Sequence, residues 1–357
     1  MHHENSRQII LLSLTNRQSE MKIILTLLSV LIIVITFSGN TLSNHKHSHK
    51  RSRKVSEKYP SWVIKKNLIV NSKLEPRNNI IKLLIDKLEA TEGIGVQVTK
   101  TEFLRLFSRR ESRIVYKDKL IKYATPNSQN IQKEEHNNYT NYLLGQDKIN
   151  EGVNFLNKYS YLLEGAERKY GVYRQDLVSI LMWESGLGKF TGNSRVFNIF
   201  MAQILFIDSA QKFALNKIIK KEGANPFADS SFREQEQKRI SHRKIYAVDG
   251  LVALLRYCKE KKMDPLCQKG SWGGAIGYAQ FMPFNLRYAV DADSDGVINL
   301  KEWPDAIYST ANYLKVKGNY SKDNKGRRGA IFQYNHSDEY VNGVVRYSDE
   351  IYKRQLQ

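Results

Sequence analysis

The sequence GSWGGAIGYAQFMPFNLRYAVDADSDGVINLKE, residues 270–302, holds two signals, one after the other. Its second half is a twelve-residue loop with an acidic side chain at alternate positions, then a glycine, and a glutamate at the end. This is the pattern of the EF-hand loop, in which carboxylates converge on a calcium ion that takes six to eight oxygens at about 2.3–2.6 Å. The predicted ligands are Asp291, Asp293, Asp295, the carbonyl oxygen of Val297, Asn299 (through water) and Glu302, and Gly296 permits the turn.

The plain alternative to a calcium loop is an acidic surface turn. Such a turn explains one or two of these side chains, but it does not explain the alternation, the glycine and the terminal glutamate together. We therefore expect Ca²⁺ to be the cofactor. It would be a structural ion in a compartment where calcium is plentiful.

The first half of the same stretch is rich in glycine. Four glycines within Gly270–Gly277 disfavour a helix and let the backbone turn tightly or approach a ligand closely. Around them lie flat aromatic side chains, among them Trp272 and Tyr278, and the neutral hydrogen-bonding side chains of Ser271 and Gln280. This combination suits an extended sugar polymer, and the alternative is a glycine-rich turn with buried aromatic residues.

The composition is that of a globular and strongly basic protein. The chain of 357 residues has 56 Lys and Arg against 36 Asp and Glu, a formal net charge of +20. This surplus favours anionic partners such as acidic wall polymers, anionic lipid or nucleic acid, without choosing among them. The sequence has no zinc-type Cys/His cluster, no phosphate-loop motif and no dinucleotide fingerprint. Only the charge speaks for nucleic acid, so we do not expect that partner. Cys258 and Cys267 could pair in an oxidising compartment, but their spacing does not require it.

The N-terminal part of the chain has the features of an export segment. Residues 1–20 are polar, and Lys22 precedes an apolar run at residues 23–37, which is shorter than the about 20 residues of a spanning helix. Residues 1–43 are therefore predicted to be an upstream extension with a signal peptide, or an uncleaved anchor that tethers the protein through the apolar run. Residues 44–75 begin with a basic stretch and are predicted to be a flexible linker. We expect an exported protein of the periplasm or cell envelope.

The rest of the chain, residues 76–357, is predicted to be one all-α domain. Apolar residues recur at three- and four-residue spacing, and runs with the period of two that is typical of strands are scarce. The segment 103–145 is predicted to form short helices and loops, and the polar segment 207–244 an insertion with one or two surface helices. Longer helices are predicted at 146–170, 175–185, 248–261, 304–317 and 339–352.

One glutamate has the position of a general acid. Glu184 follows Trp183 at the end of the predicted helix 175–185, which Gly186 terminates. A bulky apolar neighbour and the negative end of the helix dipole both disfavour the carboxylate and raise its pKa. A carboxyl group that is protonated near neutrality can protonate a glycosidic oxygen. On its own, however, a glutamate at a helix end is more often a solvated side chain.

With these three features in hand, the sequence resembles the membrane-bound lytic murein transglycosylase B family. The segments that carry the resemblance lie between about residues 140 and 352, and several long motifs in one order are a specific signal. They are AERKYGV (166–172), ILMWESGLGKFTG (180–192), DPLCQKGSWGGAIGYAQFMP (264–283), YAVDADSDGVINL (288–300), DAIYSTANYLK (305–315) and QYNHSDEYVNGVV (333–345).

The resemblance implies a lysozyme-like, mostly helical fold with a long groove. Enzymes of this family cleave the β-1,4 bond between N-acetylmuramic acid and N-acetylglucosamine in peptidoglycan, without water, and leave a 1,6-anhydromuramic end. Carried over by position, Glu184 is the sole acid/base, Ser271 and Gln280 contact the substrate around the cleavage site, and the loop 291–302 is the calcium site. A monomer that binds peptidoglycan glycan strands is expected. The residues implied to line the groove are Tyr278, Phe281, Tyr334 and Asn335.

The chain also departs from the family pattern. The segment 207–244 looks longer and more charged, and His242-Arg243-Lys244 stands where the family has an arginine pair. The basic arm 44–58 replaces the usual lipid-anchored start. These departures concern the subsites beyond the cleavage point and the anchoring, and they leave the predicted chemistry as it is.

Three rival functions belong to other classes. A muramidase-type hydrolase would release a reducing end, so the mass of the product distinguishes it. A non-catalytic, calcium-stabilised wall-binding protein would keep its function without the carboxyl group of Glu184. A nucleic-acid binder would lose affinity steeply with salt.

Overall fold

The computed structural model describes residues 79–91, 96–126 and 128–357. The predicted export segment 1–43 and the predicted linker 44–75 lie outside these residues, so those predictions stay open. No helix within the described ranges is long and apolar enough to cross a membrane.

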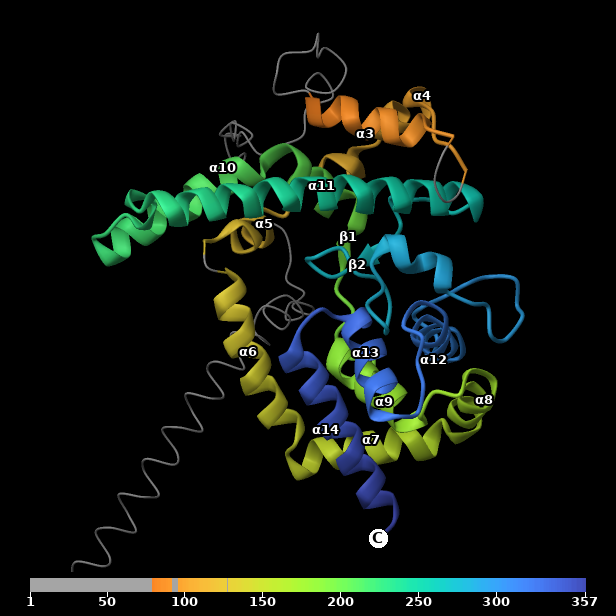
Figure 1. The fold of residues 1–357 in the computed structure, drawn as a ribbon. Helices are drawn as coiled ribbons and strands as arrows, with labels where there is room; N and C mark the ends of the chain where they lie inside the picture. Colours follow the sequence, from red (N-terminus) through yellow and green to blue (C-terminus); the bar gives the residue numbers. More distant parts are fainter. Residues whose placement is uncertain (1–78, 92–95, 127) are drawn as a thin grey trace, which may run out of the picture. The chain divides into compact units, whose positions relative to one another are not determined.

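The described part of the chain is almost entirely helical, as Figure 1 shows, and the predicted all-α class is confirmed. Its sheet structure is limited to two short antiparallel strands, β1 (Ser194–Arg195) and β2 (Lys269–Gly270). Ser194 pairs with Gly270 and Arg195 pairs with Lys269. This small sheet joins the segment after the predicted acid to the start of the glycine-rich stretch.

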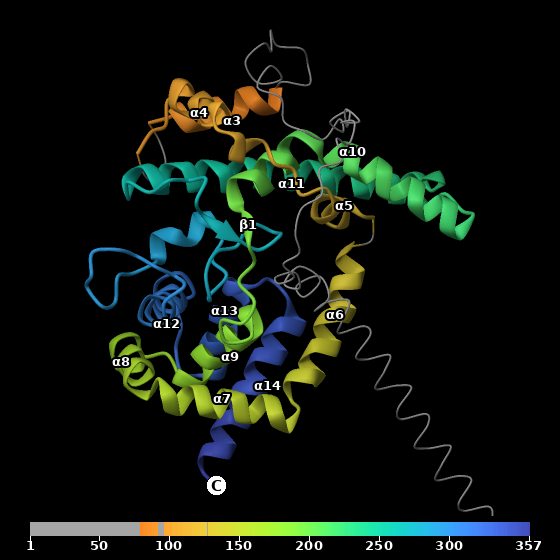
Figure 2. The same ribbon diagram turned by 180° about the vertical axis from the view of Figure 1, so that it is seen from behind.

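One group of helices packs around a long helical pair. α10 (Val196–Glu222) and α11 (Ser230–Glu260) lie side by side in both views (Figures 1 and 2). α5 (Lys117–Ala124) packs against α10, and α3 (Asn79–Glu89) packs against α11. The short elements near them are α4 (Lys100–Arg105) and the 3-10 helices η2 (Leu106–Ser108), η3 (Arg110–Arg113) and η4 (Pro226–Ala228).

A second group surrounds α9 (Arg174–Ser185). Every residue of α9 except Arg174 and Glu184 is buried, because neighbouring helices pack against the helix on several sides. Glu184 is therefore partly exposed at the C-terminal end of a helix that is otherwise buried beyond its first residue. The other elements of this group are α6 (Ser128–Leu143), α7 (Gln146–Lys158), α8 (Ser160–Tyr170), α12 (Trp303–Asn312), the π-helix η6 (Tyr313–Lys317), α13 (Asn324–Tyr334) and α14 (Asp338–Gln355). The 3-10 helix η5 (Pro283–Tyr288) packs against α11 of the first group.

A buried ion pair fastens α9 to the C-terminal helices. Asp176 in the first turn of α9 is fully buried, and Arg327 of α13 donates to both of its carboxylate oxygens, at 2.6 and 2.9 Å. The hydroxyl groups of Tyr320 (2.5 Å) and Ser348 (2.6 Å) donate to the same carboxylate. With its oxygens hydrogen-bonded in this way, the buried charge is compensated, as a buried carboxylate requires.

The helix predictions differ from the structure at several places. The predicted helix 146–170 is interrupted at Tyr159, whose backbone leaves the helical region, so that α7 and α8 can pack on different neighbours. The segment 103–145 contains one helix of 16 residues, α6, besides shorter ones. α13 was not predicted at all, because Gly326 and Gly329 interrupt its apolar pattern.

The segment 207–244 contains two helical stretches whose residues are mostly exposed, as predicted, but they are continuous with longer helices. Its residues are the outer halves of α10 and α11, and α11 begins at Ser230 rather than at residue 248. Ile207, Ala210 and Ile240 are buried in a small apolar cluster with residues of α5. The many charged residues between them hid this apolar spacing in the sequence.

The two cysteines do not form a disulfide. Cys258 is buried in α11, and burial raises the pKa of its thiol to about 12. Cys267 is exposed, and its thiol donates to the carboxylate of Asp264 (3.3 Å). Both are free thiols, so the pairing that the sequence left open is not part of this fold.

Candidate active site

The backbone at the end of α9 positions the predicted acid. The last turn is closed by hydrogen bonds from the amide of Gly186 to the carbonyl of Met182 (2.9 Å) and from the amide of Leu187 to the carbonyl of Leu181 (3.1 Å). This is a Schellman motif, and Gly186 has the left-handed conformation that it needs (φ 58°). Glu184 therefore lies in the last turn, at the negative end of the helix dipole.

Glu184 is partly buried beside a tyrosine. Tyr340, in the first turn of α14, donates its hydroxyl hydrogen to Oε1 of Glu184 at 2.7 Å. Burial raises the pKa of Glu184 from its ordinary 4.5 to about 7, and the Tyr340 hydrogen bond opposes this rise because it favours the charged form. Both forms of the carboxyl group are thus populated at neutral pH, as a group that gives up a proton and then takes one up requires.

Aromatic side chains pack around Trp183, next to Glu184. The Trp183 ring meets the rings of Tyr340 and Tyr139 edge-on, with centroids 5.1 and 5.2 Å apart, and the His136 ring at 5.9 Å. Helix α14 comes this close because of a glycine, since a Cβ atom at Gly343 would lie 2.1 Å from the Trp183 ring. Tyr340, whose hydroxyl bonds to Glu184, therefore belongs to an aromatic cluster beside the carboxyl group.

The glycine-rich stretch forms a compact turn against the segment that follows α9. Ile276 makes isolated bridges with Gly270 and Phe281. Two glycines are required by close approach and positive φ. A Cβ atom at Gly192 (φ 75°) would lie 2.2 Å from the Gly270 carbonyl oxygen, and one at Gly277 (φ 77°) would overlap Leu300. The sequence therefore brings this turn to the end of α9 through backbone contacts that only glycine allows.

The two predicted substrate contacts, Ser271 and Gln280, both lie on this turn and are partly exposed. Oγ of Ser271 accepts a hydrogen bond from the amide of Ala275 (3.1 Å). The side-chain amide of Gln280 donates to the carbonyl of Gly277 (2.7 Å) and, at 3.4 Å, to that of Thr191. These contacts orient both side chains within the turn.

The four predicted groove residues have different surroundings. Phe281 is only 1% exposed and belongs to the core, so the prediction that it lines a groove is wrong: the bridge with Ile276 turns its ring inward. Tyr278 is partly exposed and lies against Trp303, with ring centroids 4.1 Å apart. Tyr334 and Asn335 are partly exposed at the end of α13.

Tyr334 connects the glycine-rich turn with Glu184. Its hydroxyl donates to the carbonyl of Ala279 (2.5 Å), next to Gln280. Burial and the nearby charge of Glu184 raise the pKa of its phenol, which places the two side chains in one electrostatic neighbourhood. The structure therefore brings together Glu184, Tyr340, Tyr334 and the Ala279–Gln280 backbone. Tyr340 lies within the motif at 333–345, but nothing in the sequence indicates that Tyr340 rather than Tyr334 bonds to Glu184.

The acidic loop 291–302 is held by hydrogen bonds between its side chains and its backbone. The amide of Gly296 (φ 87°) donates to Oδ2 of Asp291 (2.9 Å), and the amide of Val297 donates to Oδ1 of Asp295 (2.7 Å). The Asn299 side chain donates to Glu302 (2.6 Å), directly before α12. The element before the loop is the 3-10 helix η5, where an EF-hand has an α-helix.

A further carboxylate that the sequence pattern missed completes this loop. Asp305 of α12 is buried, and its two oxygens accept hydrogen bonds from the amides of Ala292 (2.8 Å) and Asn299 (2.6 Å). Burial, together with the charges of Asp293 and Asp291, raises its pKa, and the two amide hydrogen bonds oppose this. The spacing to Asp305 exceeds the twelve-residue pattern, which is why the pattern could not include it.

The oxygen atoms of the loop fit a divalent cation. One oxygen each from Asp291, Asp293 and Asp305 lie within 4.8 Å of one another, and so do oxygens from Asp293, Asp295 and Glu302. Oδ1 of Asp291 is buried and has no hydrogen-bond partner among the described residues. An orphaned, buried carboxylate oxygen beside further carboxylates is the donor set that a hard cation takes.

Comparison with known proteins gives the class of this chain. Residues 87–328 match the family model described as the transglycosylase SLT domain. The match covers more than half of the chain, and the chain belongs to this family. The predicted resemblance to the membrane-bound lytic murein transglycosylases is thereby confirmed.

Individual relatives agree with this assignment. The chain is 27% identical to membrane-bound lytic murein transglycosylase B of Escherichia coli (strain K12) over 258 residues, which are 69% of this chain and 62% of that protein. It is similar in fold to the Escherichia coli lytic transglycosylase Slt35 in complex with bulgecin A (TM-score 0.55, 20% identity, 78% of this chain and 94% of that chain). A second structure of Slt35, in complex with calcium, gives a TM-score of 0.54 at the same identity and coverage. The predicted lysozyme-like fold is thus confirmed.

Proposed function

We propose that this protein is a peptidoglycan lytic transglycosylase that cleaves the β-1,4 bond between N-acetylmuramic acid and N-acetylglucosamine and forms a 1,6-anhydromuramic end. The observation that carries the proposal is the single carboxyl group of Glu184, whose pKa is raised by burial to about 7. Family membership supports the class of reaction, as does the relative named a lytic murein transglycosylase.

The reaction needs one carboxyl group in two successive roles. Protonated Glu184 donates its proton to the glycosidic oxygen as the bond from that oxygen to C1 of the muramyl residue breaks. The N-acetyl oxygen of the same sugar stabilises the cation that develops at C1. The carboxylate of Glu184 then takes the proton of the sugar's C6 hydroxyl as O6 bonds to C1, which closes the anhydro ring and restores the acid.

Tyr340 supports the carboxylate between these two steps. Its hydroxyl donates to Oε1 of Glu184 at 2.7 Å, and a hydrogen bond of this kind favours the charged form. A standard glycosidase uses a second carboxylate as nucleophile or as base for water. Among the described residues, no carboxylate is hydrogen-bonded to Glu184 and none contributes to its pKa shift, which favours the intramolecular route over hydrolysis.

The substrate contacts belong to the glycine-rich turn and the end of α13. We assign Ser271 and Gln280 the role of orienting the N-acetyl group, because both are neutral, partly exposed and held by the turn. Tyr278, Tyr334 and Asn335 would line the groove beside them. Phe281, which is buried, would support the turn from the core without contacting the glycan.

Ca²⁺ is the cofactor that the loop 291–302 would hold. The donor atoms are those of Asp291, Asp293, Asp295, Glu302 and the additional Asp305, and the ion would neutralise their mutual repulsion. A structurally similar protein, Slt35, has been solved in complex with calcium, which supports this choice. The ion would fix the loop, and Glu184 carries out the chemistry. Val297, through its carbonyl, and Asn299, through water, remain further proposed ligands.

The place of action follows from the substrate. Peptidoglycan glycan strands lie outside the cytoplasmic membrane, so we place the protein in the cell envelope or periplasm as a monomer that the N-terminal apolar run exports or tethers. The relative named as membrane-bound supports this location.

Replacement of Glu184 tests the assignment. Glu184→Gln keeps the shape of the side chain but cannot carry a proton, so turnover of purified peptidoglycan should fall by about 10²–10⁴-fold. The matched control is Glu222→Gln, a change at an exposed carboxylate of α10. Melting curves of both variants establish that the fold is kept. If Glu184→Gln retains more than about a tenth of the turnover, Glu184 is not the acid.

A further inference from the structure

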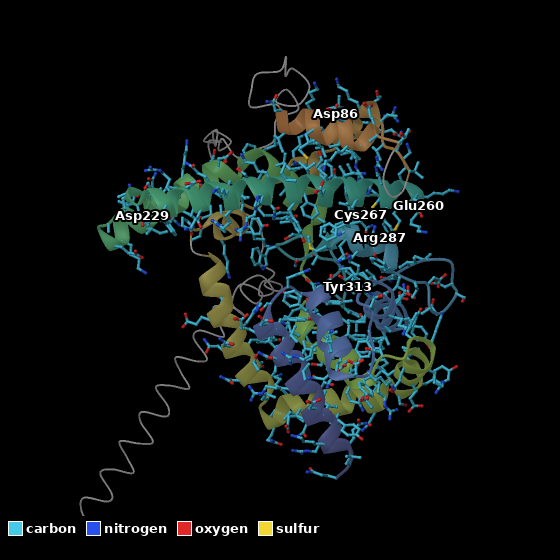
Figure 3. All side chains as sticks on the ribbon, in the orientation of Figure 1. Asp86, Asp229, Glu260, Cys267, Arg287 and Tyr313 are labelled. Atoms are coloured by element: carbon cyan, nitrogen blue, oxygen red, sulfur yellow. The ribbon has the colours of Figure 1, made fainter. Side chains whose placement is uncertain are left out.

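A large cavity lies under α11, apart from the carboxyl group of Glu184. Its volume is about 980 Å³, and residues of α3, α11, η5, η6 and the end of α13 line it. Figure 3 labels three of the lining residues, Glu260, Arg287 and Tyr313, from three of these elements. The cavity is large enough for several residues of an extended ligand.

Aromatic rings form much of the cavity wall. Tyr246 of α11 meets Phe284 of η5 edge-on, with ring centroids 5.2 Å apart. Tyr313 donates its hydroxyl hydrogen to the carbonyl of Gln333 (2.7 Å), and its ring meets that of Tyr334 at 5.0 Å. These contacts hold the wall in place without a ligand.

The cations that line the cavity differ in whether they have an acidic partner. Lys87 is paired with Asp249 (2.6 Å), and Lys261 with Glu260 (3.1 Å). Arg256 donates to backbone carbonyls at the end of α3. Two other cations remain at the exposed edge of the cavity, Arg287 and Lys317, and neither has an acidic partner among the described residues.

Tyr334 joins this cavity to the candidate active site. Tyr334 lines the cavity, and its hydroxyl donates a hydrogen bond to the carbonyl of Ala279, beside Gln280. The charge of Glu184 contributes to the raised pKa of the Tyr334 phenol, so the two side chains lie near each other. A ligand that occupies the cavity can therefore be part of the molecule that is cleaved at Glu184.

We propose that this cavity binds the acidic peptide stem of the glycan strand, with Arg287 and Lys317 as the groups that bind its carboxylates. The inference rests on the proposed function and names the part of the substrate that this chain would recognise besides the sugars. The sugars of the strand offer hydroxyl and amide groups, which cations without an acidic partner do not select. The guanidinium of Arg287 lies over the Tyr288 ring, 4.8 Å from its centroid. The peptide attached to muramic acid ends in carboxylates, and an arginine fork and a lysine point charge both bind such groups.

Direct binding tests the proposal without turnover. The full-length Glu184→Gln protein is titrated with a muramyl disaccharide that carries a tripeptide with free carboxyl groups, and with the same compound after amidation of these groups. Each exposed ion pair is worth about two- to fivefold in affinity, so the free acid should bind about tenfold more tightly at low salt. In Arg287→Gln/Lys317→Gln this preference should fall below about twofold, and the affinity for the amidated compound should stay the same.

The matched control is Arg346→Gln/Lys212→Gln. These two cations are exposed on α14 and α10, do not line the cavity, and their loss changes the net charge equally. The control should keep the tenfold preference. Melting curves verify the fold of each variant.

Several outcomes would overturn the proposal. One is equal affinity of the parent protein for the free acid and the amidated compound, and another is an equal loss of affinity for both compounds in Arg287→Gln/Lys317→Gln. A third is a control pair that reduces the preference for the free acid as much as Arg287→Gln/Lys317→Gln does. A fourth is tighter binding of inorganic tripolyphosphate than of the free acid at the same cations. The last outcome would make the cavity a general anion site. Failure of the proposed reaction would appear instead in the products of the parent enzyme, so the two failures are distinguishable.

Discussion

At Glu184 two opposing effects set the pKa of one carboxyl group. Burial among aromatic rings disfavours the charge, and the hydroxyl of Tyr340 favours it. The result is a pKa of about 7, close to the pH at which an acid that becomes a base works best. The proposed chemistry therefore depends on Tyr340 as well as on Glu184.

Removal of the Tyr340 hydroxyl should shift the pH profile upward. The cleaving form is the protonated one, so activity should fall with an apparent pKa of about 7 as the pH rises. Tyr340→Phe takes away the hydrogen bond that favours the carboxylate, and the falling limb should move to higher pH with a lower maximal rate. The control is Tyr334→Phe, because its hydroxyl bonds to a backbone carbonyl instead and its loss should leave the limb in place. An unshifted limb in Tyr340→Phe would contradict this account.

The same pKa makes a prediction about stability. The folded-state pKa of Glu184 lies above the ordinary 4.5, so the folded protein binds more protons than the unfolded chain between these values. The free energy of unfolding must therefore decrease as the pH rises from about 4.5 through about 7. The Glu184→Gln variant has no carboxyl group at this position, so its free energy of unfolding lacks this decrease. The variant should be more stable than the parent protein by about 1–3 kcal/mol at pH 8, with little difference at pH 4.

Urea unfolding of both proteins at the two pH values measures this difference. Equal stability at pH 8 would mean that Glu184 ionises as freely as in water. In that case its surroundings would not prepare it for catalysis.

At the residue level the sequence predicted Glu184 as the acid and the acidic loop as a cation site, which both stay proposals, and it misplaced one groove residue. Glu184 was recognisable because a tryptophan, a helix end and a glycine follow in one short motif. Phe281 was wrongly expected at the groove, because an aromatic residue in a turn can point either way. Tyr340 and Asp305 were missed, since their roles depend on contacts across 156 and 13 residues of sequence.

Among the elements, the acidic loop and α12 form one unit. Asp305 reaches back from α12 to the amides of Ala292 and Asn299, so loop and helix are fixed together. Carboxylates gathered in this way repel one another without a cation. Calcium should therefore stabilise this part of the fold.

Millimolar Ca²⁺ should raise the Tm by about 3–8 °C over the Tm in chelator, and Mg²⁺ should raise it less. Asp291→Asn and Glu302→Ala should each reduce this difference, since both remove an oxygen donor. The control is Asp86→Asn in α3, an exposed carboxylate outside the loop, which should keep the full effect. Identical melting curves of the parent protein in calcium and in chelator would show that the loop is only an acidic turn.

Breaking the buried ion pair between Asp176 and Arg327 should lower the free energy of unfolding strongly. Arg327→Leu leaves the buried carboxylate without its cation, and breaking a buried pair in this way costs about 3–5 kcal/mol. Asp176→Asn in the same chain should recover part of the loss. The neighbouring Arg328, which bonds to Asn342 at the surface, is the matched control, and Arg328→Leu should cost less than about 1 kcal/mol. Equal effects of the two arginine variants in urea unfolding would contradict the structural role of the pair.

Helices were predictable where the apolar spacing is regular and uninterrupted. The helix 175–185 was expected within one residue of α9, and 339–352 lies within α14. The interruption at Tyr159 was missed, because the sequence on both sides has the same apolar spacing. α13 was missed because glycines interrupt its apolar spacing. The length of α11 was underestimated because many charged residues obscure the apolar spacing in its first part.

Over the whole molecule, composition alone indicated only a basic, globular protein, and the apolar spacing added that it is mostly helical. The order of several long motifs along the chain carried the family, and the family model that matches residues 87–328 confirmed it. The cavity under α11 has no counterpart in any single motif. Its wall is assembled from elements that lie far apart in the sequence, so only the structure could reveal it.

The central claim is that one carboxyl group cleaves the glycan and that no water enters the product. The most direct measurement is digestion of purified glycan strands in water enriched in ¹⁸O, followed by mass spectrometry of the fragments. This account predicts 1,6-anhydromuramic ends that are lighter than the hydrolysed fragments by one water and contain no ¹⁸O. Muramyl reducing ends that carry ¹⁸O at C1, at the earliest times that can be sampled, would contradict it and identify a hydrolase.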